Sequence, residues 1–283
     1  MGSTPRSMEG KVVVITGGTS GIGQAGALKL AGMGARIVLV ARDRARGEAT
    51  LTRLGEANSR AEHAVHYADL SLMSETRRVA ADIAQGEQGI DVLINNAGAL
   101  FGRREVTTEG LEKTFALNHM SYFVLTEGLR ARLADDGRVV STASDAHRGA
   151  RFRIDRLQSE RYRSFGAYSL SKLCNILFTR ELARTFAGTG ITANCQHPGV
   201  VASRFFDGKP GLMGMAIKLV KPFAISNERG AETLVYLASS DEVSGVTGQY
   251  FSKCRPAIPT TEGRNDESAR ELWKKSVRLY ESA

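Results

Sequence analysis

The stretch of sequence that decides the fold runs from Lys11 to Gly23 and reads KVVVITGGTSGIG. Its first part, up to Thr16, is almost entirely β-branched, which is typical of a strand buried on both faces of a parallel sheet. The glycines that follow permit a tight turn, and they let backbone N–H groups approach a phosphate at the start of the next helix. The turn residues that we expect to contact such a ligand are Gly17, Thr19, Ser20, Gly21, Ile22 and Gly23.

Further apolar segments alternate with stretches compatible with helices along the whole chain of 283 residues. The expected strands are 11–16, 36–41, 65–68, 91–95, 138–142, 191–196 and 249–251. The expected helices are 22–32, 44–57, 74–85, 109–133, 168–186 and 229–238. This order predicts a single α/β domain of the Rossmann type, doubly wound around a central parallel sheet of about seven strands. A glycine turn alone is as often a simple break between elements, but its place after the first strand favours phosphate binding.

Composition and charge exclude several other classes of protein. The net charge of +8 suggests a nucleic-acid partner, but the basic residues are scattered and are not interleaved with aromatic residues, so none is expected. Three distant cysteines argue against a disulfide framework and a zinc site, so we expect no metal and a reducing, cytoplasmic location. Without an apolar run of about 18 residues, no transmembrane segment is predicted. Residues 1–9 are expected to form a flexible leader before a domain at 10–283.

The second expected strand ends in Ala41, and Arg42 and Asp43 follow it. At this place in such folds an acidic residue accepts hydrogen bonds from the adenosine ribose, whereas an arginine meets a 2′-phosphate. Arg42 comes first after the strand, which favours NADP(H) over NAD(H) as the cofactor. NAD(H) stays an alternative, as does a solvated charged loop with no ligand.

Tyr168 and Lys172 are four positions apart, so both side chains lie on the same face of the expected helix. A phenol is a poor acid–base catalyst at its usual pKa of about 10. A neighbouring ammonium stabilises the phenolate and lowers that pKa toward the operating pH. The pair therefore indicates proton transfer, although the same spacing is also common as a surface pair without function.

The order of the glycine turn, the strand-end sequence Asn-Asn-Ala-Gly at 95–98, a serine and then the tyrosine–lysine pair resembles the short-chain dehydrogenase/reductase family over about residues 10–279. The resemblance implies a catalytic set of Asn118, Ser144, Tyr168 and Lys172. It implies cofactor contacts from the glycine turn, Arg42, Asp69, Leu70, Asn95, Ala97, Gly98, Tyr168, Lys172, Pro198, Gly199, Val201 and Ser203. A serine replaces the family's usual threonine at position 203.

Three segments resemble the retinol-dehydrogenase-like branch of this family: SDAH at 144–147, KLCNILFTREL at 172–182 and HPGVV at 197–201. The resemblance implies mostly NADP use and lipophilic aldehyde, retinoid, steroid or aromatic carbonyl substrates. Two departures stand out. An arginine-rich insert at 148–163 separates the serine from the tyrosine, and it either covers one side of the active site or alters a surface used for oligomerisation. Membrane-bound relatives carry an N-terminal anchor that we do not find in this sequence.

In this fold family the segment that follows Ser203 closes over the substrate, so residues 204–227 are predicted to form a lid. Glycine and proline bends near its ends suit a hinged flap, and its Met and Phe side chains suit an adaptable apolar wall. A helix on a membrane surface at 211–225 is the alternative. His147 and His197 lie near the expected site, but without further metal-type ligands they are predicted to be structural hydrogen-bonding residues.

These observations predict an enzyme that transfers a hydride between nicotinamide and a small lipophilic carbonyl or alcohol substrate. Tyr168 acts as the general acid, Ser144 orients the substrate oxygen, Lys172 tunes the tyrosine and Asn118 holds a water that leads to solvent. Two alternatives stay open: a non-catalytic NADP-binding module that senses redox state, and an isomerase or dehydratase on the same fold. A homo-oligomer is compatible with the sequence.

Overall fold

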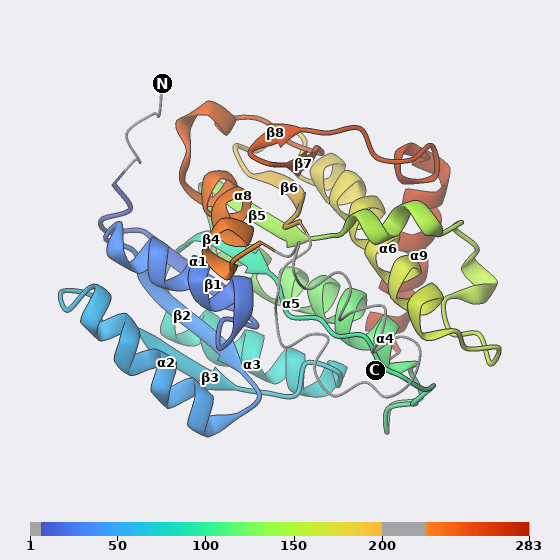
Figure 1. Cartoon of the computed structure of the whole chain (residues 1–283), viewed down its shortest axis with the longest axis horizontal. Coiled ribbons are helices and arrows are strands. Elements are labelled where there is room, and N and C mark those ends of the chain that lie inside the picture. Colours follow the sequence, from blue (N-terminus) through green and yellow to red (C-terminus); the bar gives the residue numbers. More distant parts are fainter. Residues whose placement is uncertain (1–6, 200–224, 283) are drawn as a thin grey trace.

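The computed structural model describes residues 7–199 and 225–282 (Figure 1). Within them, eight strands form one sheet in the order β3-β2-β1-β4-β5-β6-β7-β8, and only β8 is antiparallel to its neighbour. The strands are β1 (Val12–Thr16), β2 (Arg36–Ala41), β3 (Ala64–Tyr67), β4 (Ile90–Asn95), β5 (Leu133–Thr142), β6 (Thr192–His197), β7 (Tyr250–Ser252) and β8 (Arg255–Pro256). The strand order reverses between β1 and β4, so the predicted doubly wound Rossmann-type sheet is confirmed.

Helices cover both faces of this sheet. They are α1 (Gly21–Gly32), α2 (Arg44–Ala57), α3 (Met73–Gly86), α4 (Lys113–Phe115), α5 (Ser121–Leu129), α6 (Ser164–Thr185), α8 (Asn227–Ser239) and α9 (Asp266–Glu281). Helices α1, α2 and α8 share one hydrophobic core with the sheet, and α3, α5 and α6 share the other, with α9 packed beside α6 (Figure 1). A sheet covered in this way is buried on both sides, as the β-branched strands require.

The first strand shows how the sequence builds both cores. Val13 and Ile15 point into the core shared with α1 and α8, whereas Val14 points into the core shared with α3 and α5. All three side chains are fully buried. Because both faces are apolar, the strand reads as a continuous hydrophobic run, and its carboxyl end delivers the glycine turn to one edge of the sheet.

The continuous helix predicted for residues 109–133 is wrong. The stretch begins outside any helix, because Gly110 has a φ of +79° and the Glu109 carboxylate accepts hydrogen bonds from backbone N–H groups at the start of α3. The helical part is then interrupted by a π-helical turn at Ala116–Met120. At Leu133 the chain already enters β5. Apolar periodicity does not report a long-range cap of this kind.

Two elements near the C-terminal end were missing from the sequence prediction. Strand β8 follows a turn in which Lys253 and Cys254 have positive φ, so the turn lacks the glycine that usually signals a hairpin. Helix α9 is amphipathic, and Ala269 and Leu272 are buried against the α6 side of the sheet. The sheet therefore has eight strands in the described residues, one more than predicted.

The folded domain begins before the predicted boundary at residue 10. Met8 is only 3% exposed, and its N–H donates to the carbonyl of Met33 at 2.8 Å. Residues 1–6 of the predicted leader lie outside the described residues. Across residues 7–199 and 225–282, we find no helix that combines the length and the apolar character needed to cross a membrane.

Candidate active site

The glycine turn after β1 is held closely against the end of β4. Gly17 has a φ of +65°, a conformation that side chains other than glycine rarely adopt. The Asn96 side chain donates to the carbonyls of Thr16 at 3.1 Å and Gly17 at 3.3 Å. A Cβ added at Gly23 would lie 2.3 Å from the Gly17 oxygen. The turn therefore needs glycine at both positions, and its curvature fits a close approach of backbone to a dinucleotide phosphate.

The other residues of this turn are sufficiently exposed to contact a ligand. Ser20 is exposed, whereas Thr19, Gly21 and Ile22 are half-buried. Ser20 makes no side-chain capping bond to the start of α1. A helix N-terminus carries partial positive charge, so an anionic group placed here would be stabilised.

We predict that Gly23→Ala weakens NADPH binding by about tenfold or more. The added methyl group overpacks the turn, and overpacking costs roughly 1–3 kcal/mol, which the turn can relieve only by moving. Gly32→Ala in the same helix is the matched control, because its Cβ would meet nothing within 4 Å. Fluorescence titration of both variants with NADPH measures the effect. Equal affinity in Gly23→Ala and wild type would show that the turn does not hold the cofactor.

Two charged residues, Arg42 and Asp43, directly follow β2 and differ in their contacts. Arg42 is exposed, whereas Asp43 caps α2 by accepting the Arg46 N–H at 2.9 Å, which lowers its pKa. Burial alone would raise the pKa of Asp69, but hydrogen bonds from Ser71 and the charge of Arg42 bring it below its ordinary value. Arg42 and Asp69 thus lie close together at the carboxyl edge of the sheet, where both are predicted to contact the cofactor.

The predicted cofactor contacts Leu70, Asn95 and Ala97 are more buried than Arg42. Leu70 is 7% exposed. The Ala97 N–H donates to the Thr16 hydroxyl at 2.9 Å, which joins β4 to the glycine turn. The Asn95 side chain is fully buried and donates to Thr126 of α5 at 2.9 Å, inside the core. A cofactor contact by Asn95 stays a prediction, and only its backbone could provide one while this hydrogen bond is kept.

Helix α6 and the loop after β5 bring the predicted acid–base groups together. Ser144 leaves β5 and begins a short 3₁₀ turn, and its hydroxyl is hydrogen-bonded to the half-buried Tyr168 on α6. Lys172, one turn farther along, is 3% exposed and donates from Nζ to the Thr142 carbonyl at 2.9 Å. Its Nζ lies 5.7 Å from the centre of the Tyr168 ring. Tyr168 and Lys172 follow Ser144 by 24 and 28 positions in the chain, and the fold makes all three neighbours in space.

Burial dominates the electrostatics of this pair, so the predicted lowering of the Tyr168 pKa by Lys172 is not seen in the ligand-free structure. It raises the pKa of Tyr168 to about 12, and the hydrogen bond with Ser144 acts in the opposite direction. Burial also lowers the pKa of Lys172 to about 7, because the ammonium loses its hydration. The surroundings of Lys172 therefore disfavour its charged form. An anionic ligand beside Lys172 would favour its charged form and so help it to stabilise the phenolate.

Asn118 lies in the π-helical turn and connects three parts of the site. Its Oδ1 accepts the Ala99 N–H at 2.8 Å, and its Nδ2 donates to the Ala99 carbonyl and to Ser171 Oγ, each at 2.9 Å. A Cβ added at Gly98 would lie 3.2 Å from Asn118 Oδ1 and 3.4 Å from Lys172 Nζ. Both amide hydrogens are used, so one lone pair of Oδ1 is left to hold a water. π-Helical turns are frequent at functional sites.

The last predicted cofactor contacts, from Pro198 to Ser203, follow the end of β6. Pro198 and Gly199 are half-buried, and Gly199 has a φ of +86°. A Cβ at Gly199 would lie 2.8 Å from the Ile225 side chain, so the chain leaves and re-enters the described structure at neighbouring points. Val201, Ser203 and residues 204–224 of the predicted lid lie outside the described residues. Residues 225–227 of the predicted lid are described, and among them Ser226 caps α8, which begins at Asn227.

A family model described as short chain dehydrogenase matches residues 11–210. The chain belongs to the short-chain dehydrogenase family. Retinol dehydrogenase 12 of Mus musculus is 38% identical in an alignment that covers 98% of this chain and 88% of the mouse protein. These matches confirm the predicted family and its retinol-dehydrogenase-like branch.

Solved structures agree with this assignment. An uncharacterized protein from Mycobacterium paratuberculosis is 32% identical, with a TM-score of 0.78 and coverage of 98% of this chain and 96% of that one. The RhlG/NADP active-site complex of Pseudomonas aeruginosa is 28% identical, with a TM-score of 0.69 and coverage of 88% and 97%. This short-chain dehydrogenase is therefore an oxidoreductase that acts on alcohol and carbonyl groups with a nicotinamide cofactor.

The arginine-rich insert of this short-chain dehydrogenase packs beside the active site. The Tyr162 hydroxyl donates to the Phe101 carbonyl at 3.1 Å, and Gln158 accepts the Glu112 N–H at 3.1 Å. Leu157 is 5% exposed. The insert thus lies against the loop that follows β4, next to the start of α6. This position favours the first of its two predicted roles, as a cover for one side of the site, and its effect on oligomerisation stays a prediction.

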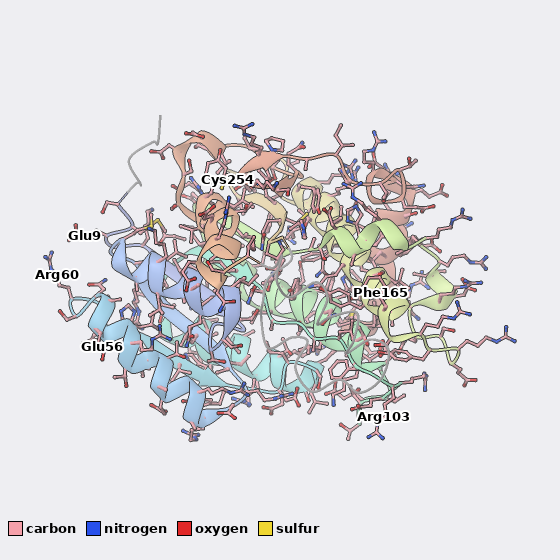
Figure 2. The ribbon with its side chains drawn as sticks, in the orientation of Figure 1. Glu9, Glu56, Arg60, Arg103, Phe165 and Cys254 are labelled. Carbon is pink, nitrogen blue, oxygen red and sulfur yellow. The ribbon has the colours of Figure 1, made fainter. Side chains whose placement is uncertain are left out.

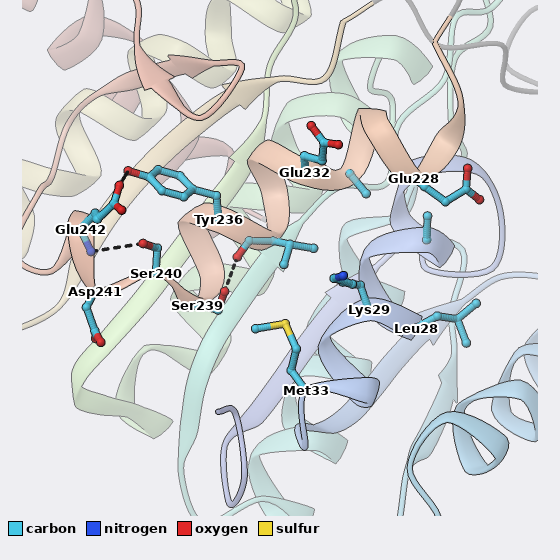
Figure 3. Close-up of a pocket in the computed structure, with 13 residues that line it drawn as sticks. Leu28, Lys29, Met33, Glu228, Glu232, Tyr236, Ser239, Ser240, Asp241 and Glu242 are labelled. Atoms are coloured by element: carbon cyan, nitrogen blue, oxygen red, sulfur yellow. Dashed lines mark hydrogen bonds between the residues drawn. The ribbon is translucent and has the colours of Figure 1, made fainter. Parts of the chain in front are cut away.

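A groove of about 670 Å³ lies elsewhere on the molecule, between α1 and α8. Figure 3 shows Leu28 of α1 and Met33, the residue after α1, on one side of the groove, and Glu232, Tyr236 and Glu242 on the other side. None of the predicted catalytic or cofactor residues lines it. The groove is therefore separate from the active site of this short-chain dehydrogenase.

Several residues that shape the site were not predicted from the sequence. Thr142 supplies the carbonyl that Lys172 and Asn175 share, at 2.9 and 3.1 Å, and a backbone acceptor has no sequence signal. Ser171 receives the Asn118 amide and donates to the Tyr168 carbonyl at 2.8 Å. Ser171 lies inside the tyrosine–lysine motif, so its position one residue before the lysine was a usable signal.

Proposed function

We propose that this protein is an NADP(H)-dependent oxidoreductase that interconverts a lipophilic carbonyl compound and its alcohol, with Tyr168 as the general acid and base. One observation carries the proposal. The hydroxyl groups of Tyr168 and Ser144 are hydrogen-bonded to each other beside the buried Lys172, at the sheet edge that also holds the glycine turn. Two hydroxyl donors that converge on one point can bind and protonate a developing alkoxide.

Each of the four predicted catalytic side chains has a separate role in the reaction. When bound, the reduced nicotinamide supplies the hydride that the carbonyl carbon receives. Ser144 hydrogen-bonds the substrate oxygen and orients it, and Tyr168 donates its proton to that oxygen as negative charge develops. Lys172 in its charged form stabilises the resulting phenolate. Asn118 holds a water through Oδ1, from which Tyr168 regains its proton by way of Lys172. For oxidation of an alcohol, Tyr168 accepts the proton instead.

The preference for NADP(H) is supported by the end of β2. Asp43, the acidic residue that could have accepted ribose hydroxyls, is occupied by the N-terminus of α2. Arg44 stacks on the Tyr67 ring at 4.4 Å, which leaves Arg42 as the exposed cation nearest the strand end. The related RhlG structure is described as an NADP complex. A guanidinium at this place suits a 2′-phosphate by charge and by hydrogen-bond geometry.

A lipophilic substrate is supported by the surface beside the acid–base pair. Phe165, on the first turn of α6, is 54% exposed, and its ring centre is 6.4 Å from that of Tyr168 (Figure 2). Its aromatic ring offers apolar surface to a ligand that approaches Tyr168. Relatives such as mouse retinol dehydrogenase 12 carry the name of a lipophilic alcohol. The apolar composition of residues 204–227 agrees with this substrate class.

The test is a screen of NADPH oxidation with aldehydes, ketones and quinones, and the reverse reaction with NADP⁺ and alcohols. We expect kcat/KM to rise along straight-chain aldehydes from three to ten carbons until the pocket is full. Each buried methylene contributes roughly 0.8 kcal/mol, or about fourfold in kcat/KM. The same screen with Phe165→Ser should flatten this rise, because the exposed aromatic surface beside Tyr168 is lost.

Three results would contradict the proposal in different ways. Efficiency that stays flat or falls with chain length would reject a lipophilic substrate but keep the oxidoreductase. NADPH binding without turnover of any compound would favour the non-catalytic redox-sensing module. Conversion of a substrate without a change in NADPH absorbance would favour an isomerase or dehydratase.

A further inference from the structure

We propose that His147 is the residue that positions Ser144 for catalysis, and that it also attaches the C-terminal segment at Thr260 to the active site. The inference rests on the proposed function for its kinetic consequence, but not for its structural one. His147 does not touch the acid–base hydroxyls. It acts through the backbone of the serine, so it is a positioning residue.

Both ring nitrogens of His147 are engaged. The side chain is fully buried, with Nδ1 2.7 Å from the Ser144 carbonyl oxygen and Nε2 3.3 Å from the Thr260 backbone nitrogen. A backbone N–H can only donate, so Nε2 is the acceptor and carries no proton. Nδ1 is then the protonated nitrogen, and it donates to the Ser144 carbonyl. The ring is therefore a neutral bridge of fixed orientation between two backbone segments 116 positions apart.

The turn that carries Ser144 depends on this bridge. Ser144 has left the β5 ladder, which ends at Thr142, so strand pairing does not hold its peptide groups. Its carbonyl receives two bonds from His147, one from the ring and one from the backbone N–H at 3.1 Å. Its hydroxyl accepts the Ala146 N–H at 3.1 Å. These contacts set the direction in which the serine hydroxyl points toward Tyr168.

The surroundings of His147 hold the same turn to the end of the sheet. The Tyr250 ring meets His147 edge to face with centres 5.3 Å apart, and the Tyr250 hydroxyl donates to Asp145 at 2.9 Å. The Asp145 N–H donates to His197 Nδ1 at 3.2 Å, at the residue before Pro198. The serine turn is thus fixed to β6 and β7 by Asp145. It is held to the C-terminal segment by His147 and by Arg148, whose guanidinium donates to the Ile258 carbonyl at 3.2 Å.

A pair of amide variants separates the two functions of the ring. In His147→Asn the Nδ2 group occupies nearly the place of Nδ1, so the donor to the Ser144 carbonyl is kept and the acceptor for Thr260 is lost. In His147→Gln the amide extends one bond farther, near Nε2, so the acceptor for Thr260 is kept and the donor to Ser144 is lost. Each variant removes one hydrogen bond, and each therefore serves as the control for the other.

We expect opposite results from the two variants. In His147→Gln, kcat falls at least about tenfold, because small misplacements of a catalytic group cost up to about 10²-fold, while the affinity for NADPH stays within about twofold. In His147→Asn, kcat stays within about threefold of wild type. The midpoint temperature of thermal unfolding should fall by similar amounts in both variants, because each variant loses one hydrogen bond.

Amide hydrogen exchange tests the structural claim without any turnover. The Ala146 amide is protected by the Ser144 hydroxyl, so its exchange rate reports the orientation of that side chain directly. It should exchange faster in His147→Gln and at the wild-type rate in His147→Asn, and the Thr260 amide should show the reverse. Equal effects of both variants on Ala146 would overturn the proposal. A protein with no carbonyl or alcohol substrate would fail the proposed function, yet this exchange pattern would still decide the role of His147.

Discussion

Tyr168→Phe is expected to lower kcat by roughly 10²–10⁴-fold, the contribution of general acid–base catalysis. The variant keeps the ring and loses only the hydroxyl that is hydrogen-bonded to Ser144. The phenol hydroxyl supplies a proton, and Tyr168 is only one of many predicted cofactor contacts. The affinity for NADPH should therefore stay within about tenfold of the wild-type value. Steady-state kinetics with the best aldehyde of the screen measures the first value, and fluorescence titration measures the second.

Tyr236→Phe is the matched control for this experiment. Its hydroxyl donates to Glu242 at 3.0 Å on the groove side of α8, away from the acid–base pair. Removal of that hydroxyl should leave kcat unchanged. Turnover of Tyr168→Phe near the wild-type rate would remove the tyrosine from the mechanism. A loss of the same size in Tyr236→Phe would show that the effect is one of general stability.

Arg42→Ala is expected to abolish most of the preference for NADPH over NADH. In the wild type, a charge-assisted contact with the 2′-phosphate contributes about 1.5–3 kcal/mol, which is roughly a 10- to 150-fold difference in affinity. The preference should also weaken at high ionic strength, because Arg42 is exposed and its charge is screened. Titration of both cofactors against wild type and variant, at low and high salt, gives these values.

Arg44→Ala controls for a general loss of positive charge at this end of the molecule. The Arg44 guanidinium is stacked on Tyr67, so its removal should change the affinity for NADPH much less than removal of Arg42. Equal affinities of the wild type for NADPH and NADH would reject the NADP assignment. An unchanged preference in Arg42→Ala, together with a lost one in Arg44→Ala, would transfer the role to Arg44.

Local sequence patterns predicted much of this fold. The β-branched run before Thr16 and the glycine turn after it became β1 and the start of α1 within one residue, and residues 44–57 became α2 with the predicted bounds. The i, i+4 spacing of Tyr168 and Lys172 correctly indicated a shared helix face, which brings Nζ to within 5.7 Å of the ring centre. These features follow from turn chemistry and hydrophobic periodicity, which act between residues close in the chain.

Packing between distant segments decided the rest. Glu109 caps α3 instead of continuing a helix, and the π-helical turn around Asn118 forms where the loop after β4 meets α6. The low pKa of Lys172 arises because two helices and a strand end exclude water from its ammonium. His147 was predicted to be a structural hydrogen-bonding residue, but its partners, the Ser144 and Thr260 backbones, became visible only in the structure. Backbone acceptors, long-range caps and burial leave no mark on residue type, so they emerge only once the sheet has brought these segments together.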